Sequence, residues 1–233
     1  MIVAIHQPNF FPWLGFFDKI ARADVFVLLD DVQFPKTGGT WTNRVKLMIG
    51  GAPEWFTVPI RRDYHGVKAT RDIAIDDSKP WRDRMRKTLE ANYGRAPHFA
   101  ETLPLVASVF AYDGGNLVDF NERGLRLTLD HLGWPSRAFV RSSTLGLAGQ
   151  GTDRLIGITK SVEGDTYLCG GGAGGYQDDA AFAAHGVTLR HQQFQHPEYP
   201  QSNRGSFQPG LSVLDALFEI GARRTAALLH QTR

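Results

Sequence analysis

The chain has 233 residues and a formal net charge of +2, with 42% hydrophobic, 21% charged and 11% aromatic residues. This composition is that of an ordinary globular protein and excludes a largely disordered chain. The small net charge and the scattered basic residues argue against a nucleic-acid partner, which would need a dense basic face. We expect a single domain over residues 1–233, because one large hydrophobic core fits this length.

Cysteine usage and the N-terminus indicate the cellular compartment. The chain has one cysteine, Cys169, so an intramolecular disulfide framework is excluded. An apolar run begins at Met1 without the charged leader of a secretory signal, and no run approaches the ~20 apolar residues that cross a bilayer. We therefore expect a cytoplasmic protein with no membrane insertion.

The first 31 residues predict a strand, a helix and a second strand. Residues 1–5 are apolar, residues 14–21 carry apolar side chains at helical spacing, and residues 25–29 form a continuous apolar run between Asp24 and the pair Asp30 and Asp31. A continuous apolar run is typical of a strand that is covered on both faces in a parallel sheet. A right-handed crossover is expected between the two strands.

Turn residues then predict a hairpin. Residues 42–48 and 55–60 flank a turn at Gly50 and Gly51, and residues 73–75 form a candidate third short strand.

Helical periodicity dominates after this hairpin. Ser78 is expected to cap the next helix and Pro80 to occupy its first turn. The expected helices span residues 78–93, 103–111, 117–132, 153–162 and 212–229, and the expected strands span residues 138–141, 166–169 and 187–189. The pattern predicts an α/β layered fold with a mainly parallel central sheet, an inserted β-hairpin and a helical middle and C-terminal part.

His6 is the leading candidate for catalysis. It ends the first predicted strand, and Pro8 and Pro12 restrict the loop that follows. Ligands of open α/β sheets bind at the carboxyl ends of strands, so an imidazole held there is a candidate general base. Asp30 and Asp31 end the neighbouring strand, and one of them is expected to orient His6. The alternatives are that His6 only hydrogen-bonds its own turn and that the carboxylates satisfy turn amides.

Residues 170–176 form a glycine-rich loop after a predicted strand. Its amides could stabilise an oxyanion or a phosphate, but the loop fits neither the P-loop nor the usual dinucleotide fingerprint. Cys169 precedes the loop and is either a nucleophile or a packing residue. Lys36 and Arg44 are candidates for binding an anionic substrate group, the alternative being a solvated face.

No His or Cys cluster has zinc spacing and no loop has calcium-ligand spacing, so we predict neither a metal nor another cofactor. The predicted catalytic residues are His6, Asp30, Asp31 and Cys169, and the predicted substrate-binding residues are Gln7, Asn9, Trp13, Gln33, Lys36, Asn43, Arg44, Gly170, Gly171, Tyr176, His191 and Tyr199.

Several motifs together resemble the WbqC-like protein family: residues 6–15 (HQPNFFPWLG), 30–34 (DDVQF), 41–44 (WTNR), Tyr167-Leu168 before the glycine loop, and residues 199–201 with 207–212. The resemblance covers almost the whole chain and implies a cytoplasmic protein of surface-polysaccharide or natural-product biosynthesis. It departs from the family at Cys169 and the glycines after it, where Ser-Gly-Pro is expected, so it implies no role for residue 169.

The resemblance and the candidate residues predict acyl or aminoacyl transfer to an amino sugar or amino acid. The small-molecule acceptor would take the acyl group from an activated donor, and an acyl carrier protein is a candidate partner. A first alternative is a nucleotidylyltransferase, whose half-domain has a similar order of elements. That superfamily has His-x-Gly-His at the helix start, whereas this chain has Trp13 and Gly15 there. A second alternative is a non-catalytic scaffold or binding protein.

Overall fold

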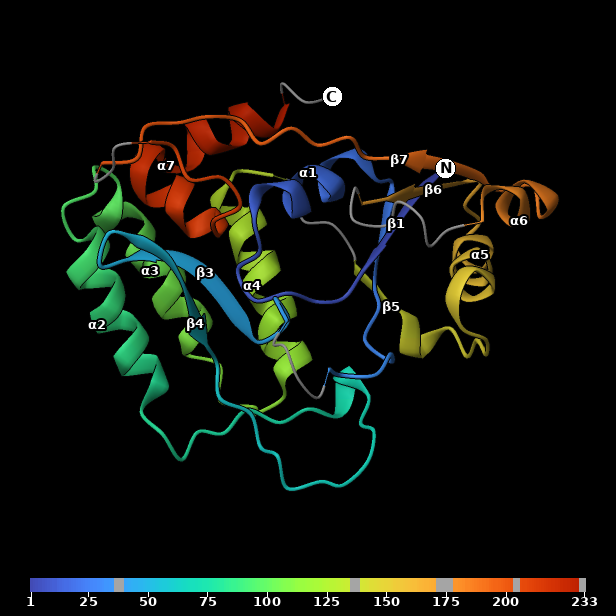
Figure 1. Ribbon diagram of the computed structural model, residues 1–233, viewed down its shortest axis with the longest axis horizontal. Helices are drawn as coiled ribbons and strands as arrows, with labels where there is room; N and C mark the ends of the chain where they lie inside the picture. The colour runs from blue at the N-terminus through green and yellow to red at the C-terminus, as the bar shows by residue number, and fades with distance from the viewer. Residues whose placement is uncertain (36–39, 135–138, 171–177, 203–205, 231–233) are drawn as a thin grey trace.

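The structure is a computed structural model that describes residues 1–35, 40–134, 139–170, 178–202 and 206–230. Its central sheet has five strands in the order β5-β2-β1-β6-β7, and every neighbouring pair is parallel (Figure 1). The strands are β1 (Ile2–His6), β2 (Val25–Leu28), β5 (Phe139–Arg141), β6 (Thr166–Cys169) and β7 (Thr188–His191). The predicted α/β fold with a mainly parallel sheet is confirmed.

The strand order places a topological switch between β1 and β6. From β1 the chain continues to β2 and β5 on one side of the sheet, and then returns to form β6 and β7 on the other. His6 pairs with Leu28 at the carboxyl end of β1, while Ala4 pairs with Leu168 on β6. In open α/β sheets the crevice at the carboxyl ends of the strands, where the order reverses, is the usual place for a ligand.

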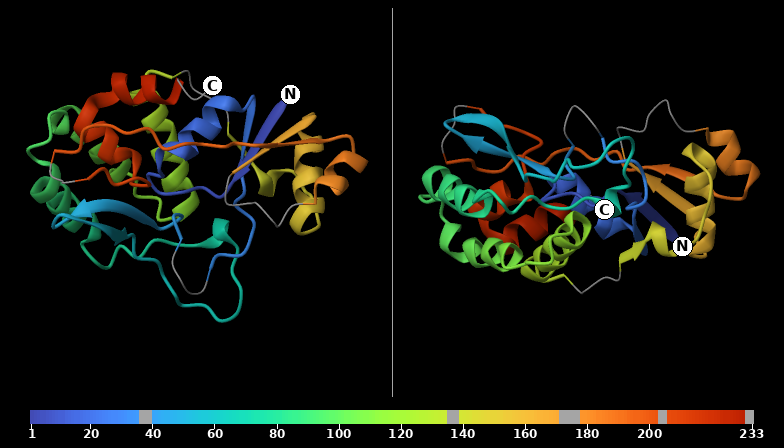
Figure 2. Two further views of the ribbon diagram at one scale, coloured as in Figure 1. Left: turned by 45° about the horizontal axis from the view of Figure 1, so that its top comes forward. Right: turned by 90° about the horizontal axis from the view of Figure 1, so that it is seen from below.

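Two hydrophobic clusters cover the two faces of the sheet. Ala4 and Leu168 face the larger cluster, whereas Val3 and Tyr167 face the smaller one, because successive side chains of a strand point to opposite faces. The larger cluster is completed by α1 (Leu14–Arg22), α2 (Trp81–Tyr93), α3 (Phe99–Phe110), α4 (Leu117–His131) and α7 (Val213–His230), and the smaller by α5 (Gly151–Ser161) and α6 (Asp179–Ala184). Figures 1 and 2 show α5 and α6 at one end of the molecule and the other helices beyond the opposite face of the sheet.

The predicted hairpin forms a separate two-stranded antiparallel sheet of β3 (Arg44–Ile49) and β4 (Ala52–Thr57). Gly50 and Gly51 make the turn with φ values of 61° and 87°, a backbone region that favours glycine. Two short 3₁₀ helices, η1 (Thr70–Asp72) and η2 (Ser142–Thr144), lie in the connections.

Several predicted boundaries were wrong. Residues 73–75 form no strand: Ala74 and Ile75 make only isolated bridges, each to a residue outside the named strands. Ser78 does not cap α2, since its hydroxyl hydrogen-bonds Asp76 instead and Pro80 is the N-cap residue.

The third and last helices also differ from the prediction. α3 begins at Phe99 and includes Pro104, whereas the apolar pattern predicted a start at residue 103. The last helix is interrupted at Gly221, which has a φ of 74° and packs against the His98 ring. A Cβ at Gly221 would lie 2.6 Å from Nδ1 of His98, so the break depends on a contact that sequence periodicity does not reveal.

Candidate active site

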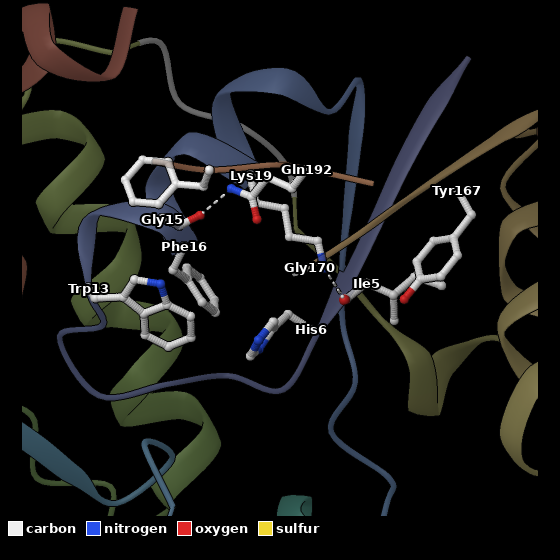
Figure 3. Close-up of a pocket in the computed structure, with 10 residues that line it drawn as sticks. Ile5, His6, Trp13, Gly15, Phe16, Lys19, Tyr167, Gly170 and Gln192 are labelled. Atoms are coloured by element: carbon white, nitrogen blue, oxygen red, sulfur yellow. Dashed lines mark hydrogen bonds between the residues drawn. The ribbon is translucent and has the colours of Figure 1, made fainter. Parts of the chain in front are cut away.

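A cavity of about 510 Å³ opens at the topological switch between β1 and β6. Its walls come from four parts of the chain that converge in space (Figure 3). The first part is Ile5 and His6 of β1, and the second is Trp13, which precedes α1, with Gly15, Phe16 and Lys19 of α1. The third is Tyr167 of β6 with Gly170, which follows β6, and the fourth is Gln192 and Phe194, which follow β7. Of the predicted site residues, His6, Trp13 and Gly170 line this cavity.

The tautomer of His6 follows from its hydrogen bond. Nδ1 lies 3.0 Å from the carbonyl oxygen of Gln7, and because a carbonyl only accepts, Nδ1 carries the proton and Nε2 keeps its lone pair. The ring packs edge-on against Phe16 with centroids 4.9 Å apart. Burial and then the nearby charge of Lys19 lower the pKa of His6 to about 3. The imidazole is therefore neutral and presents a hydrogen-bond acceptor.

Lys19 was not identified from the sequence. It is 3% exposed, and its Nζ donates a hydrogen bond of 2.9 Å to the carbonyl oxygen of Ile5 (Figure 3). Burial lowers the pKa of Lys19 to about 8, an effect that Cys169 opposes. The available signal was its place one turn after Gly15 and Phe16, on the helix face that meets the sheet.

Hydrogen bonds from Gln192 and Arg22 hold the segment after β7 against α1. Nε2 of Gln192 donates to the carbonyl oxygen of Gly15 at 2.6 Å and to Asp18 at 2.7 Å. Arg22 contacts both partners, since it pairs with Asp18 at 3.0 Å and donates to the Gln192 carbonyl at 3.2 Å. These hydrogen bonds place Phe194, two residues after Gln192, at the cavity wall.

Asp30 and Asp31 do not orient His6, contrary to the prediction. Asp30 accepts hydrogen bonds from the backbone N–H and hydroxyl of Ser143 at 2.9 and 2.7 Å. Asp31 accepts from Ser142 and pairs with Arg154 of α5. Since β2 pairs with β5, the end of β2 faces η2, and both carboxylates fasten β2 to the segment after β5. The Gln7 carbonyl holds the imidazole instead.

Cys169 is fully buried, and its Sγ lies 3.2 Å from Nδ1 of His191. Burial raises the pKa of the Cys169 thiol, which favours the thiol over the nucleophilic thiolate. Neither Cys169 nor the exposed His191 belongs to the cavity lining.

The structure does not bring the other described candidates to the cavity. Oδ1 of Asn9 accepts from Thr42 at 3.4 Å, and Asn43 donates to the Val58 carbonyl at 3.1 Å, so both buried amides support loops. The Tyr199 hydroxyl donates to Asp215 at 2.7 Å in a separate buried cluster.

Gln7 and Gln33 are not part of the cavity wall, and Gln33 is exposed in an isolated bridge with Ala69. Arg44 stacks on Trp55 on the hairpin. Lys36, Gly171 and Tyr176 lie outside the described residues.

The described ranges of the chain contain neither a metal-binding cluster nor a membrane-spanning helix. In them no group of three or more His, Cys, Asp or Glu side chains is arranged to hold a metal ion. Over the same residues, no helix combines the length and apolar character needed to span a bilayer.

Fold and site together define an open α/β protein with a parallel sheet and a ligand-sized cavity at the switch in strand order. Residues 7–227 match the WbqC-like protein family, and the chain belongs to that family. An uncharacterized protein of Mycobacterium tuberculosis, Rv1507c, is 32% identical over 223 residues, which cover 94% of each chain. No solved structure matches the chain.

Proposed function

We propose that the protein is a biosynthetic transferase that moves an acyl or aminoacyl group from an activated thioester donor to the amine of an amino sugar or amino acid. The observation that carries this proposal is the pairing of a neutral imidazole with a buried ammonium group in one cavity. His6 offers a lone pair on Nε2, and Lys19, whose pKa is about 8, is mostly protonated at neutral pH.

The two groups have complementary roles in this reaction. The neutral amine of the acceptor attacks the thioester carbonyl, and the charge that develops on the carbonyl oxygen is stabilised by the Lys19 ammonium. The nitrogen becomes more acidic once its bond to carbon forms, and the negative charge that develops on the carbonyl oxygen favours an imidazolium beside it, so the lone pair on Nε2 of His6 accepts the proton. When the carbon–sulfur bond breaks, the leaving thiolate takes that proton from His6.

The lining of the cavity supports transfer to a neutral amine. Trp13, Phe16 and Phe194 provide an apolar lining, and the Lys19 charge disfavours binding of the acceptor as an ammonium ion. A carrier protein or a small thiol could deliver the acyl group through the open side of the cavity.

A mass-spectrometric screen tests the proposal. Acyl and aminoacyl thioesters are combined with amino sugars and amino acids, and products are compared between wild type, His6→Ala, His6→Gln and Lys19→Met. Loss of the proton acceptor is expected to slow transfer by ~10²–10⁴-fold, and loss of the oxyanion partner by ~10²–10³-fold. Lys87→Met on the surface of α2 serves as the control. Full turnover by both His6 variants would show that the proposed proton acceptor is wrong.

Nucleotidyl transfer is the second candidate, and the strand order favours it. The order of the sheet equals that of the first five strands of dinucleotide-binding folds, which bind nucleotides at the same switch. Magnesium ATP or CTP should then raise the melting temperature by mass action, because ligand at 100 times its Kd adds ~2.7 kcal/mol. Arg44→Gln removes a cation of the β3–β4 hairpin, so a shift that persists in this variant argues for nucleotidyl transfer at the switch, whereas no shift in this variant argues for the acyl-transfer proposal.

A further inference from the structure

The outer face of the β3–β4 hairpin combines two cations with an indole. Lys46 pairs directly with Trp55, and Arg44 lies two residues before Lys46, so all three share one face of the two-stranded sheet. The opposite face carries Val45 and Phe56, which are buried in the core. Trp55 is 36% exposed, unlike most large apolar side chains of the described residues.

The Arg44 guanidinium is stacked on an indole and forms no ion pair with any residue that the structure describes. Its centre lies 4.0 Å from the centre of the Trp55 ring. In the described part of the chain no carboxylate forms a salt bridge with Arg44 or Lys46, and Nε of Arg44 is buried with no hydrogen-bond partner. A guanidinium that stacks through its face keeps its edge donors for an anion, and phosphate matches that fork of donors.

A row of indoles connects this face to the cavity. The ring centroids of Trp55 and Trp41 are 4.9 Å apart, and those of Trp41 and Trp13 are 5.0 Å apart. Trp13 itself lines the cavity and contacts His6 edge-on. A ligand that lies along this row therefore has one end at the hairpin and the other beside His6.

We propose that the outer hairpin face, formed by Arg44, Lys46, Trp55 and Trp41, binds the nucleotide end of the acyl donor. Its phosphate pairs with the two cations, and its base stacks against the indoles, an interaction that tolerates any base because every base has a π face. Two cations without ion pairs favour an anion over a neutral sugar, and the indoles favour a planar group over a simple phosphate. The inference rests on the proposed transfer, which places the thioester end in the cavity.

Calorimetric titration with adenosine 3′,5′-bisphosphate tests the site without turnover. Wild type should bind, and both Arg44→Gln and Trp55→Ala should weaken binding about tenfold or more. Adenosine without phosphate should bind as weakly to wild type as the bisphosphate binds to Arg44→Gln. Trp55→Phe keeps an aromatic face and should stay within about threefold of wild type, and Arg95→Gln on the exposed surface is the matched control.

The proposal is overturned if wild type does not bind the bisphosphate, or if Arg44→Gln and Trp55→Ala bind it as tightly as wild type does. His6→Gln separates this proposal from the transfer reaction, because it should bind the bisphosphate normally whether or not transfer occurs. Bisphosphate binding without any transfer contradicts only the proposed function, and transfer without bisphosphate binding contradicts only the nucleotide site.

Discussion

His6 and Lys19 are two basic side chains whose pKa values are both lowered in the same cavity. Burial is the main cause in each case, and the Lys19 charge adds to the effect on His6. Neither group has a carboxylate hydrogen-bond partner in the described structure, since each contacts a backbone carbonyl. Holding two such groups in an apolar cavity costs stability, which is typical of a functional site.

The low pKa of His6 predicts acid sensitivity. In the unfolded chain the His6 side chain binds a proton below about pH 6.5, whereas in the folded chain it binds one only below about pH 3. The unfolded state therefore gains a proton first, and the contribution of His6 to the free energy of unfolding falls as the pH falls from 6.5 towards 3. At pH 5 the effect amounts to ~2 kcal/mol. His6→Gln should therefore lose less stability than wild type between pH 7 and pH 5 in urea unfolding. The control variant His185→Gln, at an exposed site, should lose as much free energy of unfolding between pH 7 and pH 5 as wild type. Equal losses in wild type, His6→Gln and His185→Gln would contradict the prediction.

Lys19→Met is expected to be more stable than wild type at pH 7. The folded chain binds the Lys19 proton only below about pH 8, whereas the unfolded chain holds it up to about 10.5. Burying that charge costs ~1–3 kcal/mol at neutral pH, and methionine of similar length removes the cost. The difference in free energy of unfolding between Lys19→Met and wild type should become smaller from pH 8 to pH 10, and urea unfolding at each pH measures it. A less stable variant at pH 7 would mean that the hydrogen bond to Ile5 outweighs the buried charge.

At the scale of elements, the first turn of α1 is shaped by Gly15. A Cβ there would lie 2.7 Å from Nε1 of Trp13 and 2.8 Å from Cδ1 of Phe194, both of which line the cavity. The absence of a side chain at residue 15 thus lets α1 and the segment after β7 meet at the cavity wall, where Gln192 connects them.

Gly15→Ala should damage the site with little change in stability. The added methyl group must displace the Trp13 indole or the Phe194 ring, so transfer is expected to fall about tenfold or more. Gly157→Ala in α5 is the matched control, because its Cβ would lie 3.9 Å from Leu147 in ordinary contact. That control should gain ~0.5–1 kcal/mol and keep full activity. Unfolding curves and turnover are measured for both variants. Normal turnover by Gly15→Ala would show that transfer does not depend on the positions of the Trp13 and Phe194 rings.

At the scale of the whole molecule, Asp215 joins distant parts of the chain beside the hairpin. It accepts hydrogen bonds from the hydroxyls of Tyr93 at 2.8 Å and Tyr199 at 2.7 Å, and from Gln201 at 2.9 Å. Tyr93 also accepts a hydrogen bond from the Met48 amide of β3, so the cluster connects α2, α7, the hairpin and the segment after β7. Burial raises the pKa of Asp215.

Asp215→Ala should destabilise the protein by ~3 kcal/mol, because two buried hydroxyls lose their acceptor. Asp215→Asn keeps one oxygen acceptor and nearly the same volume, so it should lose clearly less. Thermal unfolding of the two variants measures the difference. Equal losses would show that the volume and packing of the side chain, rather than its hydrogen bonds, stabilise this cluster.

The predicted elements that agree best with the structure are those with strong local patterns. The strand at residues 166–169 matches β6, and the helix expected at 117–132 matches α4 within one residue, because continuous apolar runs and long amphipathic periodicity are local properties. His6 could be placed at a strand end for the same reason. The partners of Asp30 and Asp31 could not be predicted, since they depend on which strand lies beside β2.

The amino-acid sequence by itself determined the α/β class, the parallel strands, the hairpin and the family. These features depend on apolar periodicity and short motifs, which are formed by residues that are neighbours along the chain. Only the tertiary structure decided that Lys19 faces His6, that Gln192 and Phe194 complete the cavity, and that the carboxylates lie elsewhere. The reason is physical: the charge state and the partner of a side chain depend on burial and on neighbours that are distant in the chain, and these exist only once the strand order is set.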